Sequence, residues 1–190
     1  MAYLIIGIVI MLGMHFFGMF APAARGRIVA QIGDGPWKGI HSIVSLIGLG
    51  LMIYGWWLAR GAPEGGFVYA PPDWGRHLSM LLVLIGFILI GASHGEGNIK
   101  LWVKQPMSIG IALWAIGHLV ANGERADIWL FGSILLLAIV DVVVSTARGK
   151  VPHCQPRLRS DILAVVVGIV LYLVFLFGFH PYILGVPVVS

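Results

Sequence analysis

Charged side chains are scarce in this sequence. Asp, Glu, Lys and Arg make up 11% of the 190 residues, whereas 59% of the residues are hydrophobic. A soluble globular domain carries about 25% charged residues, so the composition excludes that class of protein. It predicts an integral membrane protein, in which apolar side chains face lipid and the backbone is paired within helices.

The chain also lacks the sequence features of several enzyme and transporter classes. Its single cysteine, Cys154, cannot form an internal disulfide, and the adjacent His153 adds too few ligands for a zinc site. No phosphate-binding glycine loop, nucleophile elbow or His-Glu-x-x-His motif occurs. Transport helices rich in Arg or Asp are missing as well. These absences count against a hydrolase, an ATPase and an ion-driven pump.

Long apolar runs are abundant, and a membrane-spanning helix needs about 20 such residues. The fourth run is the shortest, since it follows Pro106 and ends at Asn122 and Gly123, so five spans with one re-entrant segment is the alternative to six. Asp127 is expected to be the N-cap of the next helix. Short connections predict one all-α polytopic bundle, a single transmembrane domain over residues 1–190. The six candidate spans are 3–21, 39–59, 77–94, 107–121, 127–145 and 162–179.

Basic residues predict the orientation of these spans. The loops on one side hold only Arg60, Arg76 and Arg125. By the positive-inside rule the richer loops are cytoplasmic and both termini lie outside. The cations are spread over three short loops without a recognition motif, which argues against binding of nucleic acid. The richer loops hold Arg25, Arg27, Lys38, Lys100, Lys104, Arg148, Lys150, Arg157 and Arg159.

Two histidines, His15 and His118, fall inside predicted spans, where ionisable groups are rare and usually functional. With a rise of about 1.5 Å per residue, they differ in depth by roughly 10 Å. A haem with two histidine ligands is compatible with that separation. Small residues one turn away, Gly18 and Ala115, would let a flat macrocycle approach. The alternative is that each histidine forms a hydrogen bond between helices.

Other polar residues form two stripes. His41 with Ser45, and Asp141 with Ser145, would make a polar pocket near the cytoplasmic side, or would reach the interface by snorkelling. Trp114 precedes His118 by one turn and would pack in the core or beside a cofactor. The other six tryptophans lie near span ends, as in interfacial aromatic belts: Trp37, Trp56, Trp57, Trp74, Trp102 and Trp129.

Three segments carry a family resemblance. They are "GMHFFGMFAPAARGRIVAQIGDGPWKGIHSIVSLIGLGL" from Gly13, "QPMSIGIALWAIGHLVANGERADIWLFGSILLLAIVD" from Gln105 and "HPYILGV" from His180. Together they resemble the NnrU family of bacterial membrane proteins over nearly the whole length. That family is associated with denitrification and is similar to the 15-cis-zeta-carotene isomerase of plants and cyanobacteria, a membrane enzyme that uses haem b with histidine ligands.

The resemblance implies haem b as a cofactor of this chain. It implies His15 and His118 as axial ligands, with His41 as the substitute if one of them is wrong. One departure stands out, because the family often has His-Pro before the fourth helix where this chain has Gln105 and Pro106. A remote third activity, thiol methyl transfer, fits that turn poorly.

Two classes of function follow. In the first, the protein is a redox-gated haem protein of the bacterial inner membrane that binds nitric oxide or isomerises a lipid-soluble polyene. Arg25 and Lys38 would then pair with haem propionates, unless they serve only to set topology. In the second, it is a non-catalytic accessory or sensor of nitrite and nitric oxide metabolism, and its histidines only hold helices together. Whether it is an enzyme stays open between the two.

Overall fold

The computed structural model of the chain describes residues 1–60, 62, 66–186 and 188. Over these residues it is helical apart from loops and one isolated bridge between Phe67 and Glu124. The elements are α1 (Ala2–Phe20), α2 (Pro22–Ile32), α3 (Asp34–Ala59), α4 (Gly75–Ser93), α5 (Asn98–Val103), α6 (Pro106–Ala121), α7 (Arg125–Ala147), α8 (Leu158–Val174) and the π-helix η2 (Phe175–Ile183).

Five of the described helical segments are long and apolar enough to cross a membrane: α1, α3, α4, α7 and the continuous run from Leu158 to Ile183. The shorter apolar helix α6 has 16 residues and is not interrupted. At about 1.5 Å per residue it spans roughly 24 Å, less than the typical hydrocarbon core. The predicted polytopic helical membrane fold is confirmed, and the six apolar helices coincide with the six predicted runs. The orientation of the termini stays a prediction.

Helix boundaries follow local chemistry. Pro22 and Pro106 each occupy a first-turn position, where the missing N–H costs nothing. The prediction that Asp127 is an N-cap is wrong, since α7 begins at Arg125 and Asp127 lies in its first turn. Its Oδ2 accepts a 3.2 Å hydrogen bond from the backbone N–H of Glu124. This is one of the two hydrogen bonds of a capping box, in which the acidic side chain at N3 accepts from the backbone N–H of the N-cap residue.

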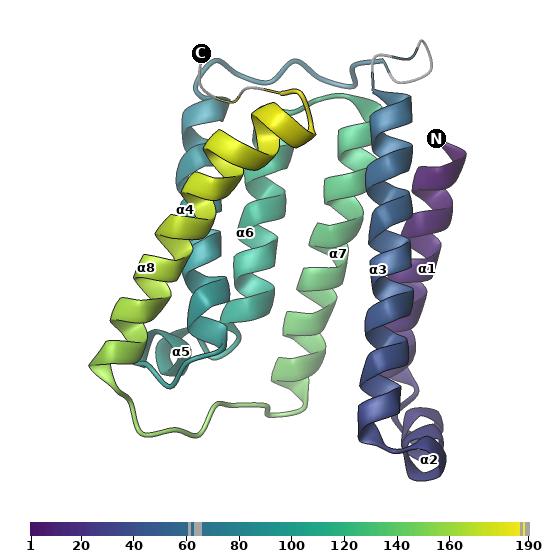
Figure 1. The fold of residues 1–190 in the computed structure, drawn as a ribbon, viewed down its shortest axis with the longest axis vertical. Helices are drawn as coiled ribbons and strands as arrows, with labels where there is room; N and C mark the ends of the chain where they lie inside the picture. The colour runs from purple at the N-terminus through teal and green to yellow at the C-terminus, as the bar shows by residue number, and fades with distance from the viewer. Residues whose placement is uncertain (61, 63–65, 187, 189–190) are drawn as a thin grey trace. The chain divides into compact units, whose positions relative to one another are not determined.

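The described chain forms two compact units, Met1–Ala70 with Gly123–Ser133, and Pro71–Asn122 with Ile134–Ser190. In the first unit α1 packs along α3, and α2 contacts both (Figure 1). In the second, α6 and α8 both pack on α4, while α5 contacts all three (Figure 1). The prediction of a single domain over 1–190 is not decided by this division and stays a prediction.

Glycines set the close approach of helices within each unit. A Cβ at Gly7 would lie 2.6 Å from the carbonyl oxygen of Gly48, which pins α1 against α3. A Cβ at Gly91 would lie 2.9 Å from the carbonyl oxygen of Ala164, so this glycine lets α4 approach α8 closely. Small residues of this kind let backbones approach where lipid provides no hydrophobic driving force.

Candidate functional site: two histidine pairs

The first histidine pair lies between α1 and α3. The ring centres of His15 and His41 are 4.8 Å apart, and their planes meet at 69°. Nδ1 of His15 is 2.9 Å from the carbonyl oxygen of Met11, one turn earlier. A carbonyl only accepts, so Nδ1 is the donor, which in a neutral imidazole leaves the lone pair on Nε2. This is the tautomer of a histidine that ligates a metal through Nε2.

The second pair lies between α6 and η2. The rings of His118 and His180 are nearly parallel, at 18°, with centres 6.1 Å apart. Nδ1 of His118 donates to the carbonyl oxygen of Trp114 at 2.9 Å, and Nδ1 of His180 to that of Phe175 at 2.8 Å. Both rings are therefore held by their own helices with the lone pair on Nε2.

A tryptophan precedes one member of each pair by four residues. The ring of Trp37 is 6.3 Å from that of His41, and the ring of Trp114 is 4.6 Å from that of His118. In the segments "WKGIH" and "WAIGH", the four-residue spacing places the indole and the imidazole side by side on one helix face. This repeated spacing is a sequence signal that could have singled out both positions.

The C-terminal π-helix positions His180. Pro181 lies inside η2 and cannot donate a backbone hydrogen bond, and the helix here follows the wider i to i+5 pattern. The Nδ1 hydrogen bond of His180 spans the same five residues, back to Phe175. In the sequence, His180 directly follows the last predicted run, 162–179, and its pairing with His118 was not predicted. Isolated π-turns are frequent at functional sites.

The structure brings together some of the predicted ligands. His15 meets His41, whereas His118 meets His180, a residue not among the predicted ligands. His15 belongs to the first unit and His118 to the second, so their pairing on one haem stays a prediction. In the part of the chain that the structure describes, no three His, Cys, Asp or Glu side chains gather into a metal-binding group.

The polar stripe of α7 has a partner that the sequence did not indicate. The carboxylate of Asp141 accepts a hydrogen bond from the hydroxyl of Ser108 on α6, and Oγ of Ser145 lies 3.5 Å from its other oxygen. Ser108 is buried. His41 and Ser45 belong to the first unit and Asp141 to the second, so a pocket shared by both stripes stays a prediction.

A buried polar cluster joins α3 to α7 in the first unit. Nε1 of Trp56 donates a 2.7 Å hydrogen bond to Oδ1 of Asp127, and the guanidinium of Arg60 lies 5.3 Å from the centre of the Trp56 ring. Burial, and then the nearby Asp127, raises the pKa of Tyr69. Trp56 lies near the end of α3, as predicted. Its side chain is 8% exposed and that of Asp127 is 5% exposed, so the hydrogen bond between them is buried.

Lys38, one of the two cations expected near a haem, pairs with an acidic side chain. Nζ of Lys38 lies 2.5 Å from Oδ2 of Asp34, one turn earlier on α3, and both side chains are largely exposed. Exposed pairs at this spacing contribute about 0.3–0.5 kcal/mol. Lys38 thus lies one turn into α3, paired with Asp34. Its pairing with a haem propionate stays a prediction.

The sequence is similar to a known protein family over nearly its whole length. The profile described as NnrU protein matches residues 3–188. No curated protein and no solved structure matches the chain significantly. The match covers almost all of the chain, including both histidine pairs. This multi-pass membrane protein belongs to the NnrU family.

Proposed function

We propose that this protein binds haem b through His118 and His180 and that it responds to nitric oxide in the bacterial inner membrane. The observation that carries the proposal is the geometry of this pair. Imidazole nitrogens bind metal ions at about 2 Å, so two histidines that held one ion between them would have ring centres roughly 6 Å apart. The rings of His118 and His180 are 6.1 Å apart.

The donor set suits a haem iron. Each Nδ1 is bonded to a backbone carbonyl, which fixes the ring orientation and leaves Nε2 as the ligating nitrogen. Aromatic rings lie close by, since Trp114 is 4.6 Å from His118 and Phe179 is 6.2 Å from His180. Rings of this kind give a macrocycle flat apolar neighbours.

The first pair fits one iron less well. The rings of His15 and His41 are 4.8 Å apart, closer than the roughly 6 Å that opposite ligands of one ion require. We therefore assign the ligand role to His118 and His180 before His15 and His41. His118 and His180 would hold haem b, which would supply one-electron chemistry and an iron suited to small gases such as nitric oxide. The link to denitrification rests on membership of the NnrU family.

An absorption spectrum of the detergent-purified protein, oxidised and then reduced with dithionite, tests the proposal. We expect a Soret band and sharp reduced bands that are lost in His118→Ala and in His180→Ala. His77→Ala is the matched control, because this histidine is exposed at the start of α4. Nitric oxide should shift the Soret band of the reduced wild type.

Other outcomes overturn parts of this proposal. Loss of the bands in His15→Ala and His118→Ala, with His180→Ala unchanged, would instead support the ligand pair that the family resemblance implies. A wild-type protein that stays colourless after haem is added would contradict haem binding altogether.

The non-catalytic accessory role is the second candidate, and one observation favours it. Both histidine pairs already have structural contacts, because their rings pack on one another and three of the four bond to a carbonyl of their own helix. The ring contacts link two helices without any cofactor, and the intrahelical hydrogen bonds fix the ring orientations. Under this role, the histidine variants lower thermal stability while the protein binds no haem.

A further inference from the structure

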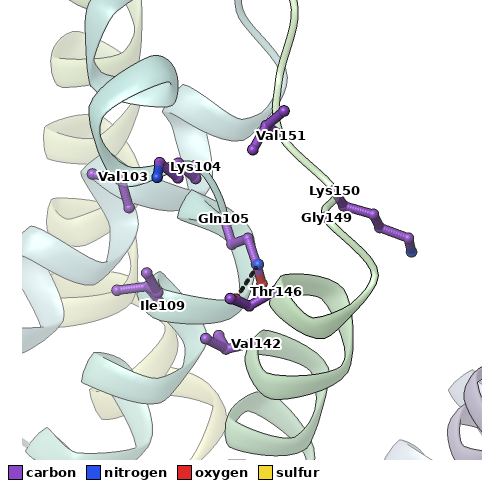
Figure 2. A pocket seen from close by; sticks show the side chains of 9 residues that line it. All are labelled: Val103, Lys104, Gln105, Ile109, Val142, Thr146, Gly149, Lys150 and Val151. Atoms are coloured by element: carbon purple, nitrogen blue, oxygen red, sulfur yellow. Dashed lines mark hydrogen bonds between the residues drawn. The ribbon is translucent and has the colours of Figure 1, made fainter.

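A groove with a volume of about 290 Å³ lies in the second unit, where the turn between α5 and α6 meets the end of α7 (Figure 2). Side chains such as Ile109 and Val142 form its apolar wall. Its polar side chains include Lys104, Gln105 and Lys150, and none of the described residues that line it is acidic. The groove therefore combines an apolar wall with positive charge.

Gln105 supplies an unused hydrogen-bond acceptor. Its Nε2 donates to Oγ1 of Thr146 at 2.9 Å, and Figure 2 shows the side chain reaching from the start of α6 to the last turn of α7. Its Oε1 is buried and has no hydrogen-bond partner in the described part of the chain. A buried carbonyl without a donor is unfavourable, so a ligand hydroxyl in the groove would satisfy it.

The backbone at Lys104 is strained. This residue has φ 64° and ψ −44°, and the N–H of Gln105 donates to the carbonyl oxygen of Val103 at 2.7 Å. Lys104 is thus the central residue of a γ-turn with positive φ, which is rare and strained for a residue with a side chain. It is the one non-glycine residue with positive φ in the described chain. Strain of this kind concentrates at ligand clamps.

The end of the second unit that carries the groove is rich in cations. Lys104 and Lys150 are exposed, and the Lys150 side chain extends away from Gln105 in Figure 2. Both side chains can therefore rotate toward a ligand. At the same end Arg157 lies 3.5 Å from Glu96. The positive-inside rule puts these loops at the cytoplasmic leaflet, where basic pockets between helices bind anionic headgroups.

We propose that the groove binds phosphatidylglycerol. The phosphodiester pairs with Lys104 and Lys150, and a glycerol hydroxyl donates to Oε1 of Gln105. The part of the acyl chains nearest the headgroup lies along Ile109 and Val142. A zwitterionic lipid would bind less tightly, because its ammonium group would be repelled by the two lysines. A free phosphate would also bind less tightly, because it makes no contact with the apolar wall. This site is independent of haem binding.

Native mass spectrometry of the full-length protein, delipidated in detergent and titrated with lipid, tests the proposal. We expect phosphatidylglycerol to bind more tightly than phosphatidylcholine of the same acyl chains. One cation near a headgroup changes affinity by about fivefold, so Lys104→Gly with Lys150→Ala should weaken phosphatidylglycerol binding by about 25-fold. Gln105→Leu should remove the preference for phosphatidylglycerol over phosphatidic acid, which lacks the glycerol hydroxyls.

The matched control is Lys100→Ala, which removes a lysine from the same loop but not from the groove. It should leave phosphatidylglycerol binding within twofold of wild type. Glycine at position 104 adopts the positive φ without strain, and a thermal melt without lipid verifies folding. Equal binding of both lipids, an equal loss in Lys100→Ala, or full competition by inorganic phosphate or glycerophosphoglycerol would each overturn the lipid site.

Discussion

The indole Nε1 of Trp56 on α3 donates a 2.7 Å hydrogen bond to Oδ1 of Asp127 on α7, and both side chains are buried. The contact joins residues 71 positions apart in the sequence. A buried acceptor that loses its donor costs about 1–3 kcal/mol. Asp127 also accepts from the backbone of Glu124, so it anchors the start of α7 as well as α3.

We expect Trp56→Phe to lower the free energy of unfolding by about 1–3 kcal/mol, because it leaves the Asp127 carboxylate without its indole donor. Trp57→Phe is the control, since the Trp57 side chain is 57% exposed. Thermal unfolding in detergent, followed by circular dichroism, measures both variants. Equal midpoints for the two variants would mean that the hydrogen bond contributes nothing measurable.

Gly86 and Gly110 bring α4 and α6 into backbone contact. A Cβ at Gly110 would lie 2.6 Å from the carbonyl oxygen of Gly86, and a Cβ at Gly86 would lie 2.7 Å from that of Gly110. We expect Gly110→Ala to destabilise the protein by about 1–3 kcal/mol, because neither backbone can yield without moving a helix.

Gly50→Ala on α3 is the matched control for Gly110→Ala. A Cβ at Gly50 meets no described atom within 4 Å, so alanine there should be neutral or stabilising by up to about 1 kcal/mol. Unfolding by dodecyl sulfate titration of mixed micelles compares the two variants. A stabilised Gly110→Ala would contradict the close approach of α4 and α6.

Apolar runs were enough to predict the six apolar helices, five of which are long enough to cross a membrane. The six runs read from the sequence coincide with α1, α3, α4, α6, α7 and the segment from α8 through η2, because hydropathy and length are properties of each segment alone. The starts of α6 and α7 show the limit. Pro106 marked a helix start correctly, whereas Asp127 was misassigned because an acid near a helix start serves equally well at N-cap or N3.

The side-chain contacts between different helices could not be predicted from the sequence. His15 and His118 were singled out because each is an ionisable group in an apolar run, but that signal says nothing about helix rotation or neighbours. His118 meets His180 through a π-helix around Pro181, a backbone feature that hydropathy does not encode. Asp127 was predicted only as a helix cap, because its hydrogen-bond partner Trp56 comes from a distant segment.

Tyr69 makes the stability of the first unit depend on pH in the alkaline range. Burial and the carboxylate of Asp127 raise its pKa above the ordinary 10.0. Below that value both the folded and the unfolded chain keep the phenol proton, so Tyr69 adds no pH dependence. Once the pH rises through about 10, only the unfolded chain releases the proton, and the free energy of unfolding falls until the folded-state pKa is reached.

We therefore expect Tyr69→Phe to lose less stability than wild type between about pH 9 and pH 11. Thermal midpoints measured across this range, with the difference between the two proteins plotted against pH, isolate the contribution of Tyr69. Parallel curves for the two proteins would show that the phenol titrates alike in the folded and unfolded chains.

The γ-turn at Lys104 gives opposite expectations for two neighbouring lysines. Lys104 has φ 64°, whereas Lys100 lies inside the helix α5. Glycine relieves the strain at a positive φ, which costs about 1–3 kcal/mol, but lowers helix stability by about 1 kcal/mol within a helix. Lys104→Gly should therefore raise the thermal midpoint in lipid-free detergent, and Lys100→Gly should lower it. Both variants remove one positive charge from the segment between α4 and α6, so a difference in sign cannot come from charge. If phosphatidylglycerol is then added, the order should reverse: the lipid should stabilise the Lys100→Gly protein strongly and the Lys104→Gly protein weakly, because only Lys104 lines the groove.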